Sequence, residues 1–342
     1  MLRIAADGSG RRLMLFGRPP AGSSDNGSAQ DAPDWTRVRP ATIRSTLERA
    51  QALPAGGWYV LDGSRQIRER PSFYWVAGRE VVAWRMDGVA RAAPNACPHM
   101  SAPLSEGRVR HGRLVCPWHG LELAAKRHGA WAPLPTCDDG VLTWVRLEDG
   151  DPATDRPILA QRPARYIEGT IRRVARCEPG DVLANRLDPW HGAHFHPHTF
   201  ARLRVLDETD DVLRVRVAFR VLGRFCVEVD CTFHCPERRT IVMTIVDGEG
   251  VGSVVETHAT PLAPGYTAVI ETTLATSERI GFALARRASF VVRPFIERAA
   301  GRLWVEDAAY AERASYLRRG DDPARWIAES GPTVSPGARV QP

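Results

Sequence analysis

The sequence predicts an α+β protein of two domains, a small all-β domain followed by an antiparallel sheet packed on helices. Between Gly56 and about Leu147, short apolar runs alternate with turn residues, which is typical of short strands. After Pro163 the alternating runs become longer, and a helical pattern closes the chain. A chain of 342 residues is long enough for two domains that each bury a core.

The elements of the first half follow from local patterns. Residues 20–38 are rich in Gly, Ser, Asp and Pro, so we expect residues 1–40 to form a partly disordered N-terminal extension. A short helix over 41–52 should lead into a β domain that ends near residue 150. Its clearest strands are expected at 58–61, 73–76, 81–84 and 141–145.

The second domain is expected over residues 160–318, before a C-terminal tail at 319–342. Alternating strands are predicted at 203–207, 212–221, 225–233, 240–246, 252–260 and 266–274. A helical stretch follows from about 281 to 317, with interruptions near Pro294 and Gly301.

Several cysteines in the strand that begins at residue 225 raise the question of a second metal site. Cys226, Cys231, His234 and Cys235 offer suitable ligand atoms. The segment alternates as a strand does, so Cys231 and Cys235 would share one face with apolar neighbours. Cysteine often behaves as a small buried hydrophobe, and packing is therefore the favoured interpretation.

Two short loops carry one cysteine and one histidine each, Cys97-Pro-His99 and Cys116-Pro-Trp-His119. Two thiolates and two imidazoles are the ligands of a Rieske 2Fe-2S cluster, with the cysteines on one iron and the histidines on the other. The same side chains can form a tetrahedral zinc site, which is the alternative. Zinc fingers usually pair Cys with Cys and His with His along the chain, so the mixed pairs favour a Rieske cluster and an electron-transfer site.

The chain resembles the Rieske non-haem iron oxygenases, the α-subunit family of ring-hydroxylating oxygenases. Residues 97–107 and 112–120 are similar to the family's cluster loops, and Asp188-Pro-Trp-His191-Gly-Ala-His-Phe-His196 is similar to its mononuclear iron motif. The resemblance covers roughly residues 55–318 and is greatest to the monooxygenase and demethylase branch. It implies an N-terminal Rieske 2Fe-2S domain followed by an antiparallel-sheet, helix-grip catalytic domain.

The resemblance also implies the ligands of a mononuclear Fe(II). It makes His191 and His196 the two histidine ligands and Asp307 the carboxylate, with Glu306 as the alternative. Two histidines and one carboxylate bind one face of the metal and leave positions open for dioxygen and substrate. Taken alone, Glu306 and Asp307 would suit the positive N-terminal end of a helix equally well.

Polar residues around the two histidines are expected to support the iron. The resemblance makes Asp188 the acid that hydrogen-bonds a Rieske histidine of a neighbouring subunit and an iron-ligating histidine of its own, although Asp-Pro can simply begin a helix. It makes Asn185 a polar neighbour of the iron. His194 and His198 are equally capable ligands by chemistry, and only the spacing favours residues 191 and 196 over them.

The activity that the resemblance implies is that of an oxidoreductase, a Rieske monooxygenase or dioxygenase. It would use O2, and electrons from NAD(P)H passed on by a ferredoxin and/or flavin reductase, to hydroxylate or oxidatively demethylate a hydrophobic aromatic, steroid or isoprenoid substrate. The two metals of one subunit in this family are too far apart for efficient transfer, so a homotrimer is implied. The alternative is a Rieske electron carrier, or a redox or ligand sensor without oxygenase turnover.

Composition limits the classes of partner and the cellular location that we expect for this protein. The formal net charge is +6, but the basic residues are almost all Arg and are scattered among acids, so we expect no nucleic-acid partner. No run of eighteen apolar residues is present, so we expect no transmembrane segment. Seven cysteines make no disulfide framework, and the apolar run that ends at Gly17 is too short for a signal peptide. These features predict a cytoplasmic protein.

Overall fold

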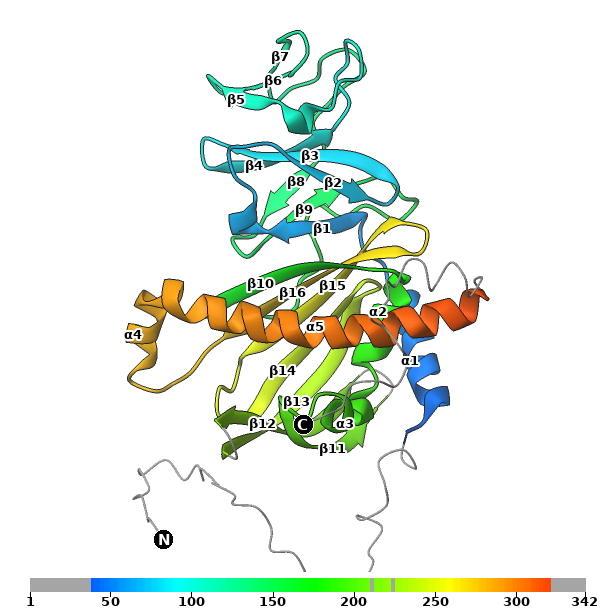
Figure 1. Ribbon diagram of the computed structural model, residues 1–342, viewed down its shortest axis with the longest axis vertical. Coiled ribbons are helices and arrows are strands. Elements are labelled where there is room, and N and C mark those ends of the chain that lie inside the picture. Colours follow the sequence, from blue (N-terminus) through cyan, green and yellow to red (C-terminus); the bar gives the residue numbers. More distant parts are fainter. Residues whose placement is uncertain (1–37, 210–211, 223–224, 321–342) are drawn as a thin grey trace, which may run out of the picture.

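The computed structural model describes residues 38–209, 212–222 and 225–320. The expected N-terminal extension and C-terminal tail therefore lie almost wholly outside the described residues. A small β domain stands on one side of a large sheet, and a long helix crosses the other side of that sheet (Figure 1). In the part of the chain that is described, no helix is long and apolar enough to cross a membrane.

Three small antiparallel sheets build the first domain, which helix α1 (Pro40–Gln51) precedes. The first contains β1 (Trp58–Gly63), β9 (Leu142–Arg146) and β8 (Thr136–Asp138). The second contains β2 (Ser72–Val76), β3 (Arg79–Met86) and β4 (Val89–Pro94). The third, at the tip of the molecule, contains β5 (Arg108–Arg110), β6 (Arg113–Val115) and β7 (Glu122–Leu123). Two 3-10 turns, η2 (Ser64–Gln66) and η3 (Leu104–Glu106), complete it.

The second domain is built on one antiparallel sheet of seven strands in the order β10-β16-β15-β14-β13-β12-β11. These strands are β10 (Ile167–Ala175), β11 (Phe200–Glu208), β12 (Leu213–Leu222), β13 (Phe225–Glu237), β14 (Thr240–Gly248), β15 (Val254–Ala263) and β16 (Tyr266–Ala275). The expected strands lie where the sequence placed them. The α+β fold class, with a small β domain followed by an antiparallel sheet and helices, is therefore confirmed.

The helices are placed by the order of the strands. β10 and β11 form opposite edges of the sheet, so the chain between them must cross the sheet. It does so as α2 (Pro179–Arg186), η4 (Pro189–His191) and α3 (Gly192–Phe195). After β16, α4 (Phe282–Arg287) and α5 (Ser289–Arg319) return across the same face. Two segments far apart in the sequence, 185–196 and 303–310, are thereby brought together.

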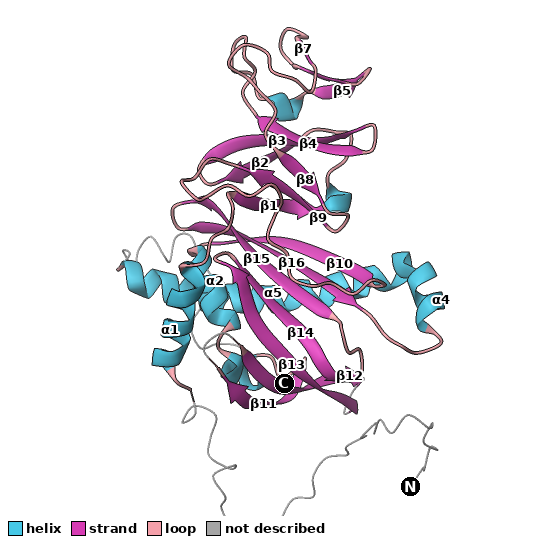
Figure 2. Ribbon diagram, turned by 180° about the vertical axis from the view of Figure 1, so that it is seen from behind, coloured by secondary structure: helices cyan, strands magenta, loops and turns pink. Residues whose placement is uncertain are grey.

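Each face of the large sheet has its own apolar core. On the helix side, Trp304 and Ala311 of α5 and Leu183 of α2 pack with Ile241 and Val269 of the sheet. On the opposite side a separate core joins the two domains, and the strands there lie in front of α5 when the molecule is seen from behind (Figure 2). This second core contains Trp58, Val60 and Trp144 of the first domain and Val242, Val254, Leu262 and Ile270 of the sheet.

The C-terminal helices differ from the prediction in where they break. The helical stretch is interrupted at Ala288, while α5 runs unbroken for 31 residues through Pro294 and Gly301, so the predicted interruptions are wrong. Pro294 lies early in α5 and removes only one backbone hydrogen bond there. Burial of Trp304 and Asp307 farther along holds the helix on the sheet, and tertiary packing of this kind commonly outweighs local propensity.

Candidate metal centres

The cysteine-histidine loops have the same backbone shape. In each loop the cysteine N–H donates to the carbonyl five residues later, and the residue four positions after the cysteine donates back to the cysteine carbonyl, at 2.8 to 3.2 Å. That donating residue is Ser101 in one loop and Gly120 in the other, and both have positive φ. A non-glycine residue with positive φ is uncommon, which indicates that the loop shape is held firmly at Ser101.

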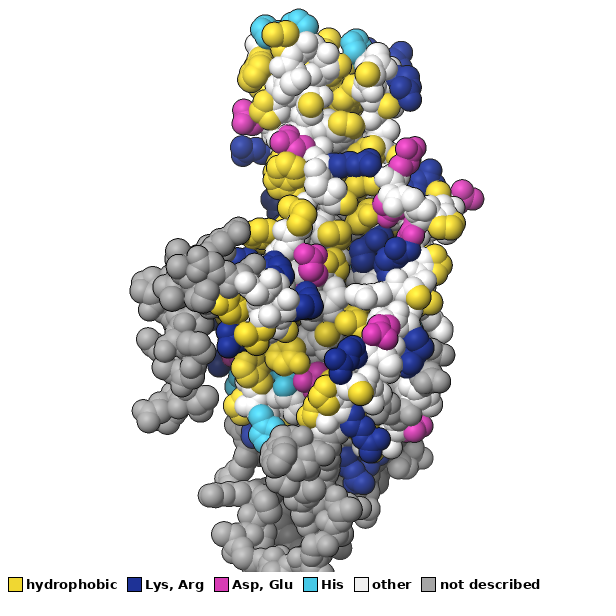
Figure 3. Space-filling view, turned by 90° about the vertical axis from the view of Figure 1, so that its right-hand side faces the viewer, with side chains coloured by type: hydrophobic (Ala, Val, Ile, Leu, Met, Phe, Trp, Pro, Cys, Tyr) yellow, Lys and Arg dark blue, Asp and Glu magenta, His cyan; other side chains and the backbone are white. Residues whose placement is uncertain are grey.

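In these loops the two cysteine side chains are buried and the two histidine side chains are exposed. Cys97 and Cys116 are each 2% exposed and in contact through their thiols, and burial raises the pKa of Cys97. His99 and His119 are exposed, with ring centroids 4.9 Å apart. Histidine side chains accordingly gather at the exposed tip of the molecule (Figure 3). Two sulfurs inside and two imidazoles outside fit a two-iron cluster with Cys on one iron and His on the other.

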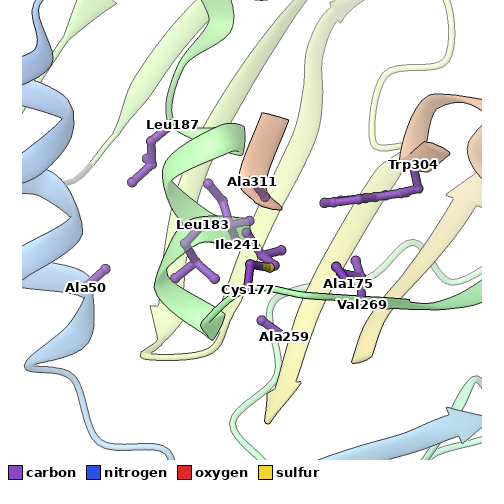
Figure 4. Packing of buried hydrophobic residues seen from close by; sticks show 11 residues of the cluster. Ala50, Ala175, Cys177, Leu183, Leu187, Ile241, Ala259, Val269, Trp304 and Ala311 are labelled. Carbon is purple, nitrogen blue, oxygen red and sulfur yellow. The ribbon is translucent and has the colours of Figure 1, made fainter. Parts of the chain in front are cut away.

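The second group of ligand candidates is built by two short helical turns and α5. The side chain of Asp188 caps η4 by accepting from the Trp190 N–H at 3.2 Å, and Pro189 occupies the first position of the turn. His191 ends η4, and His196 follows α3. The core that positions them contains residues of α2, α5 and the sheet (Figure 4).

Three side chains meet where these segments face each other. The Nε2 atoms of His196 and His191 lie 2.8 and 3.3 Å from the same oxygen of Asp307, Oδ1. One ligand atom from each of the three residues falls within 4.8 Å of the others. His196 is 1% and Asp307 2% exposed. The structure thus brings together the three residues that the sequence singled out for iron.

The charges of this group are strongly coupled. Burial alone would raise the pKa of Asp307, but hydrogen bonds from His191 and His196 and the nearby Arg186 hold it well below its usual range. Burial likewise disfavours a charged His191, yet the carboxylates of Asp188 and Asp307 raise its pKa to about 9. The two shifts show that the histidines and Arg186 favour a negative Asp307, while the carboxylates favour a positive His191.

The donor set fits a non-haem iron. Two imidazole nitrogens and a carboxylate oxygen on one side of a buried point form the facial triad of Fe(II) oxygenases. Asn185 donates from Nδ2 to Asp307 at 3.1 Å, and its buried Oδ1 has no hydrogen-bond partner among the described residues. A buried polar atom without a partner is rare in proteins, and here it lies beside the three converging ligand candidates.

A second carboxylate lies near the Nδ1 atom of each of the two histidines. His196 Nδ1 lies 2.5 Å from Oε2 of Glu306, and His191 Nδ1 lies 3.8 Å from Oδ2 of Asp188. The Tyr310 hydroxyl donates to the same Asp188 oxygen at 3.1 Å, and its ring stacks on His191. Carboxylates in this position fix the tautomer and orientation of metal-binding imidazoles.

Two family models match the chain. Residues 57–145 match the Rieske [2Fe-2S] domain, and residues 148–322 match the family described as Domain of unknown function (DUF5914). The second match covers just over half of the chain, so the chain is a member of that family. It belongs to the Rieske non-haem iron oxygenases. The cofactors of this Rieske oxygenase family member are accordingly a 2Fe-2S cluster and a mononuclear iron.

Curated relatives match over limited segments. The chain is 34% identical over 175 residues to chlorophyllide a oxygenase of Chlamydomonas reinhardtii, which is 47% of this chain and 27% of that protein. It is 32% identical over 159 residues to the oxygenase component of dicamba O-demethylase of Stenotrophomonas maltophilia, 41% of this chain and 46% of that protein. The chain thus spans less than half the length of these relatives.

Solved structures share the fold over a larger part of the chain. The structure of dicamba monooxygenase bound to 3,6 dichlorosalicylic acid has a TM-score of 0.59 at 21% identity, covering 79% of this chain and 91% of that one. The terminal oxygenase of carbazole 1,9a-dioxygenase from Nocardioides aromaticivorans IC177 has a TM-score of 0.56 at 14% identity, covering 85% and 92%. The arrangement of the two domains is therefore that of Rieske oxygenases.

The remaining histidines and cysteines do not join either group. His194 is exposed, and His198 lies 3.8 Å from Glu306 without supplying an atom to the three-residue group. Cys231 and Cys235 pack in apolar clusters on the helix side of the sheet, as the strand pattern of β13 indicated.

Sequence reasoning missed a polar layer behind Asp307. Glu271 of β16 accepts from Trp304 Nε1 at 2.6 Å and from Thr257 Oγ1 at 3.1 Å, and it forms an ion pair with Arg186. Arg186 directly follows Asn185 in the chain, but nothing in its local sequence shows that it turns inward to this pair. Tyr310 was missed as well, although its place one helical turn after Glu306 puts the two on one side of α5.

Proposed function

We propose that the protein is the oxygenase component of a Rieske system that uses O2 to hydroxylate or oxidatively demethylate a hydrophobic substrate. The observation that carries the proposal is the convergence of His191, His196 and Asp307 in a buried group, in a chain that also has a Rieske domain. An electron carrier needs only the Rieske domain. The second group of ligands argues for turnover at a second metal.

In this proposal His191, His196 and Asp307 hold the mononuclear iron. Iron bound there would supply dioxygen activation beside the substrate, with electrons from the cluster. Glu306 would accept from the Nδ1–H of His196, and the Asp188 carboxylate would attract the Nδ1–H of His191 from 3.8 Å, leaving the Nε2 lone pairs free to face the metal. Asn185 would hold Asp307 in place through its amide.

The same proposal assigns the cluster to Cys97, His99, Cys116 and His119. Electrons would come from NAD(P)H through a ferredoxin and/or a flavin reductase that docks near the exposed histidines. Support comes from their position at the tip of the domain and from a related solved structure described as an oxygenase and ferredoxin complex of carbazole 1,9a-dioxygenase.

We further propose that the active form is a homotrimer in the cytoplasm. In a head-to-tail trimer, Asp188 would link the neighbour's cluster to His191 of its own subunit. Its contacts with Tyr310 and with His191 support such a bridging role. The cysteines form no disulfide among the described residues, which is compatible with a reducing compartment.

The proposed substrate is aromatic, steroid or isoprenoid in character. Support comes from an apolar cluster on the sheet face beside α3, of which Phe200 lies next to His196 with ring centroids 6.0 Å apart. Its residues are Phe200, Leu203, Val205, Leu213, Val215, Val217, Phe219, Val227, Val229, Cys231, Phe233, Met243 and Ile245. A surface of this kind binds substrate by burying apolar area and offers few polar groups to an ionic one.

Electron paramagnetic resonance tests the proposal directly. Dithionite-reduced protein should give a Rieske signal, and nitric oxide added to the Fe(II) protein should give an Fe–NO signal that His191→Ala/His196→Ala alone removes. Substrate-dependent oxygen uptake with a reductase should then require both signals. A Rieske signal without any Fe–NO species in iron-replete wild-type protein would identify an electron carrier or a sensor instead.

A further inference from the structure

The most exposed large apolar side chains of the described residues gather in one segment. Ile280 is 100%, Phe290 73%, Leu284 71% and Phe295 71% exposed. Among all described residues, no other large apolar side chain is more than 60% exposed. Val291, at 50%, lies among them. The segment begins at Ile280, two residues before α4, and continues through α4 into the first turns of α5. It projects from one end of the long helix (Figure 1).

The same segment is basic. Residues 278–302 contain six arginines and two glutamates, a formal charge of +4. Arg286, Arg287 and Arg298 are exposed, and no ion pair of theirs with another described residue is found. We call the exposed apolar residues Ile280, Leu284, Phe290, Val291 and Phe295, together with these three arginines, the α4–α5 surface.

Such a surface needs a partner. Soluble monomers rarely leave large apolar side chains gathered in the open, and a contiguous patch of them marks an interaction site. Apolar side chains flanked by arginines on a helix are typical of segments that lie in the interface of a bilayer, with rings among the acyl chains and guanidinium groups among phosphates.

Charge and position argue against a second copy of the chain as the occupant. The tip of the Rieske domain exposes Arg108, Arg110 and Arg113, so it would meet the α4–α5 surface with the same sign of charge. In a head-to-tail trimer that tip would approach Asp188, which lies next to α2, while α4 lies beyond the opposite end of α5 (Figure 1). An anionic lipid surface would bury the apolar side chains among its acyl chains and pair the arginines with its head groups.

We propose that the α4–α5 surface docks the protein on a lipid bilayer that carries anionic head groups. The docked surface continues toward the iron ligands, because Val291, Phe295, Arg302 and Glu306 recur at helical spacing along α5. At 1.5 Å per residue, Phe295 lies only about 17 Å along the helix from Glu306. Uptake of an apolar substrate from the bilayer along this face rests on the proposed function, whereas docking itself does not.

Vesicle sedimentation with the full-length, iron-loaded protein tests the docking. Wild-type protein should sediment with phosphatidylglycerol/phosphatidylcholine vesicles and much less with phosphatidylcholine alone, and added salt should weaken the binding. Arg286→Gln/Arg287→Gln should lower the partition coefficient on anionic vesicles by about 30-fold, since each arginine near such a surface contributes about fivefold. Phe290→Ser/Phe295→Ser should lower it by at least about 100-fold.

A matched control comes from the Rieske domain. Phe73 and Trp75 form an exposed aromatic pair on β2, each 42% exposed, so Phe73→Ser/Trp75→Ser removes similar apolar area elsewhere. That variant should bind vesicles as the wild type does, and all variants should keep the Rieske signal as evidence of folding.

Three results would overturn the docking proposal. One is a wild type that does not sediment with anionic vesicles. Another is a folded Phe290→Ser/Phe295→Ser protein that binds as well as the wild type. The third is that Phe290→Ser/Phe295→Ser dissociates the oligomer while the wild type does not bind vesicles. That result would identify the surface as a subunit interface. None of these results depends on oxygenase turnover, so the proposed function can fail or hold independently.

Discussion

The cluster loops and the iron-ligand group place histidine in two different settings. His99 and His119 are exposed, and no side-chain hydrogen bond of either is found among the described residues. His196 is buried, with carboxylates on both ring nitrogens. In the loops, backbone hydrogen bonds fix the shape of the chain around the cysteines and leave the imidazoles open to solvent. In the group of His191, His196 and Asp307, side chains of α5 hold the ring of His196 in a buried position.

The largest effects should separate the two sites completely. His119→Ala should remove the reduced Rieske signal and leave the Fe–NO signal, while His196→Ala should do the reverse. The reason is that the ligands lie in different domains and share no side chain. Paramagnetic resonance and iron analysis of both variants measure the outcome. Loss of both signals in either variant, with the fold intact by circular dichroism, would contradict this separation.

The next largest effect concerns the link between the sites. Asp188→Ala should leave both metals bound but slow electron transfer from cluster to iron by about 100-fold or more, because in the proposed trimer Asp188 links the neighbour's cluster to His191. Stopped-flow reoxidation of the reduced cluster in a single turnover measures this rate. Coupled turnover at the wild-type rate would rule out the bridging role, as would an active enzyme that is strictly monomeric.

A smaller effect tests Glu306 as the residue that orients His196. Glu306→Ala should weaken Fe(II) binding by about 10-fold to 100-fold, as is usual when the carboxylate behind a metal-binding imidazole is lost. Glu306→Gln keeps an acceptor oxygen and should be affected less. Anaerobic Fe(II) titration with the Fe–NO signal as readout gives the affinity, and its line shape reports the orientation of the ligands.

Glu297 on the same helix provides the control for Glu306. Glu297 lies beside Gly169 of β10, away from the iron ligands, so Glu297→Ala should bind iron normally. If Glu306→Ala removes the Fe–NO signal entirely while Asp307→Ala retains it, then Glu306 is the ligand and the assignment of Asp307 is wrong.

Sequence patterns and three-dimensional contacts contributed to different parts of this picture. Strand alternation and the spacing of Cys, His and Asp identified the elements and the ligand candidates, because periodicity and short motifs are local properties. The carboxylate behind His196 could not be read in this way. Glu306 and His196 are 110 residues apart in the chain, and only the crossing of α5 over the sheet brings them together.

The same limit applies to Arg186, Glu271 and the break at Ala288. An arginine on a short helix is usually exposed, and only the packing of α2 on α5 buries Arg186 beside Glu271. Pro294 signals a helix end in isolation, but the buried residues after it decide the length of α5. Local rules therefore failed where long-range packing overrode them.

The smallest expected effect shows whether His191 and His196, the proposed iron ligands, are held in place independently of each other. Tyr310→Phe removes the hydroxyl that donates to Asp188 but keeps the ring on His191, so Fe(II) affinity should fall by about fivefold, near 1 kcal/mol. Tyr266→Phe, on the exposed start of β16, serves as the control.

Double-mutant cycles then distinguish shared from separate support. Tyr310 acts on His191 through Asp188, whereas Glu306 acts on His196. Tyr310→Phe should therefore add to Glu306→Ala within about 0.5 kcal/mol, and should have little further effect in Asp188→Ala. Strong coupling between Tyr310 and Glu306 would mean that α5 positions both imidazoles as one unit. The iron-ligand group would then differ from the cluster loops because one helix, rather than separate side chains, holds its histidines.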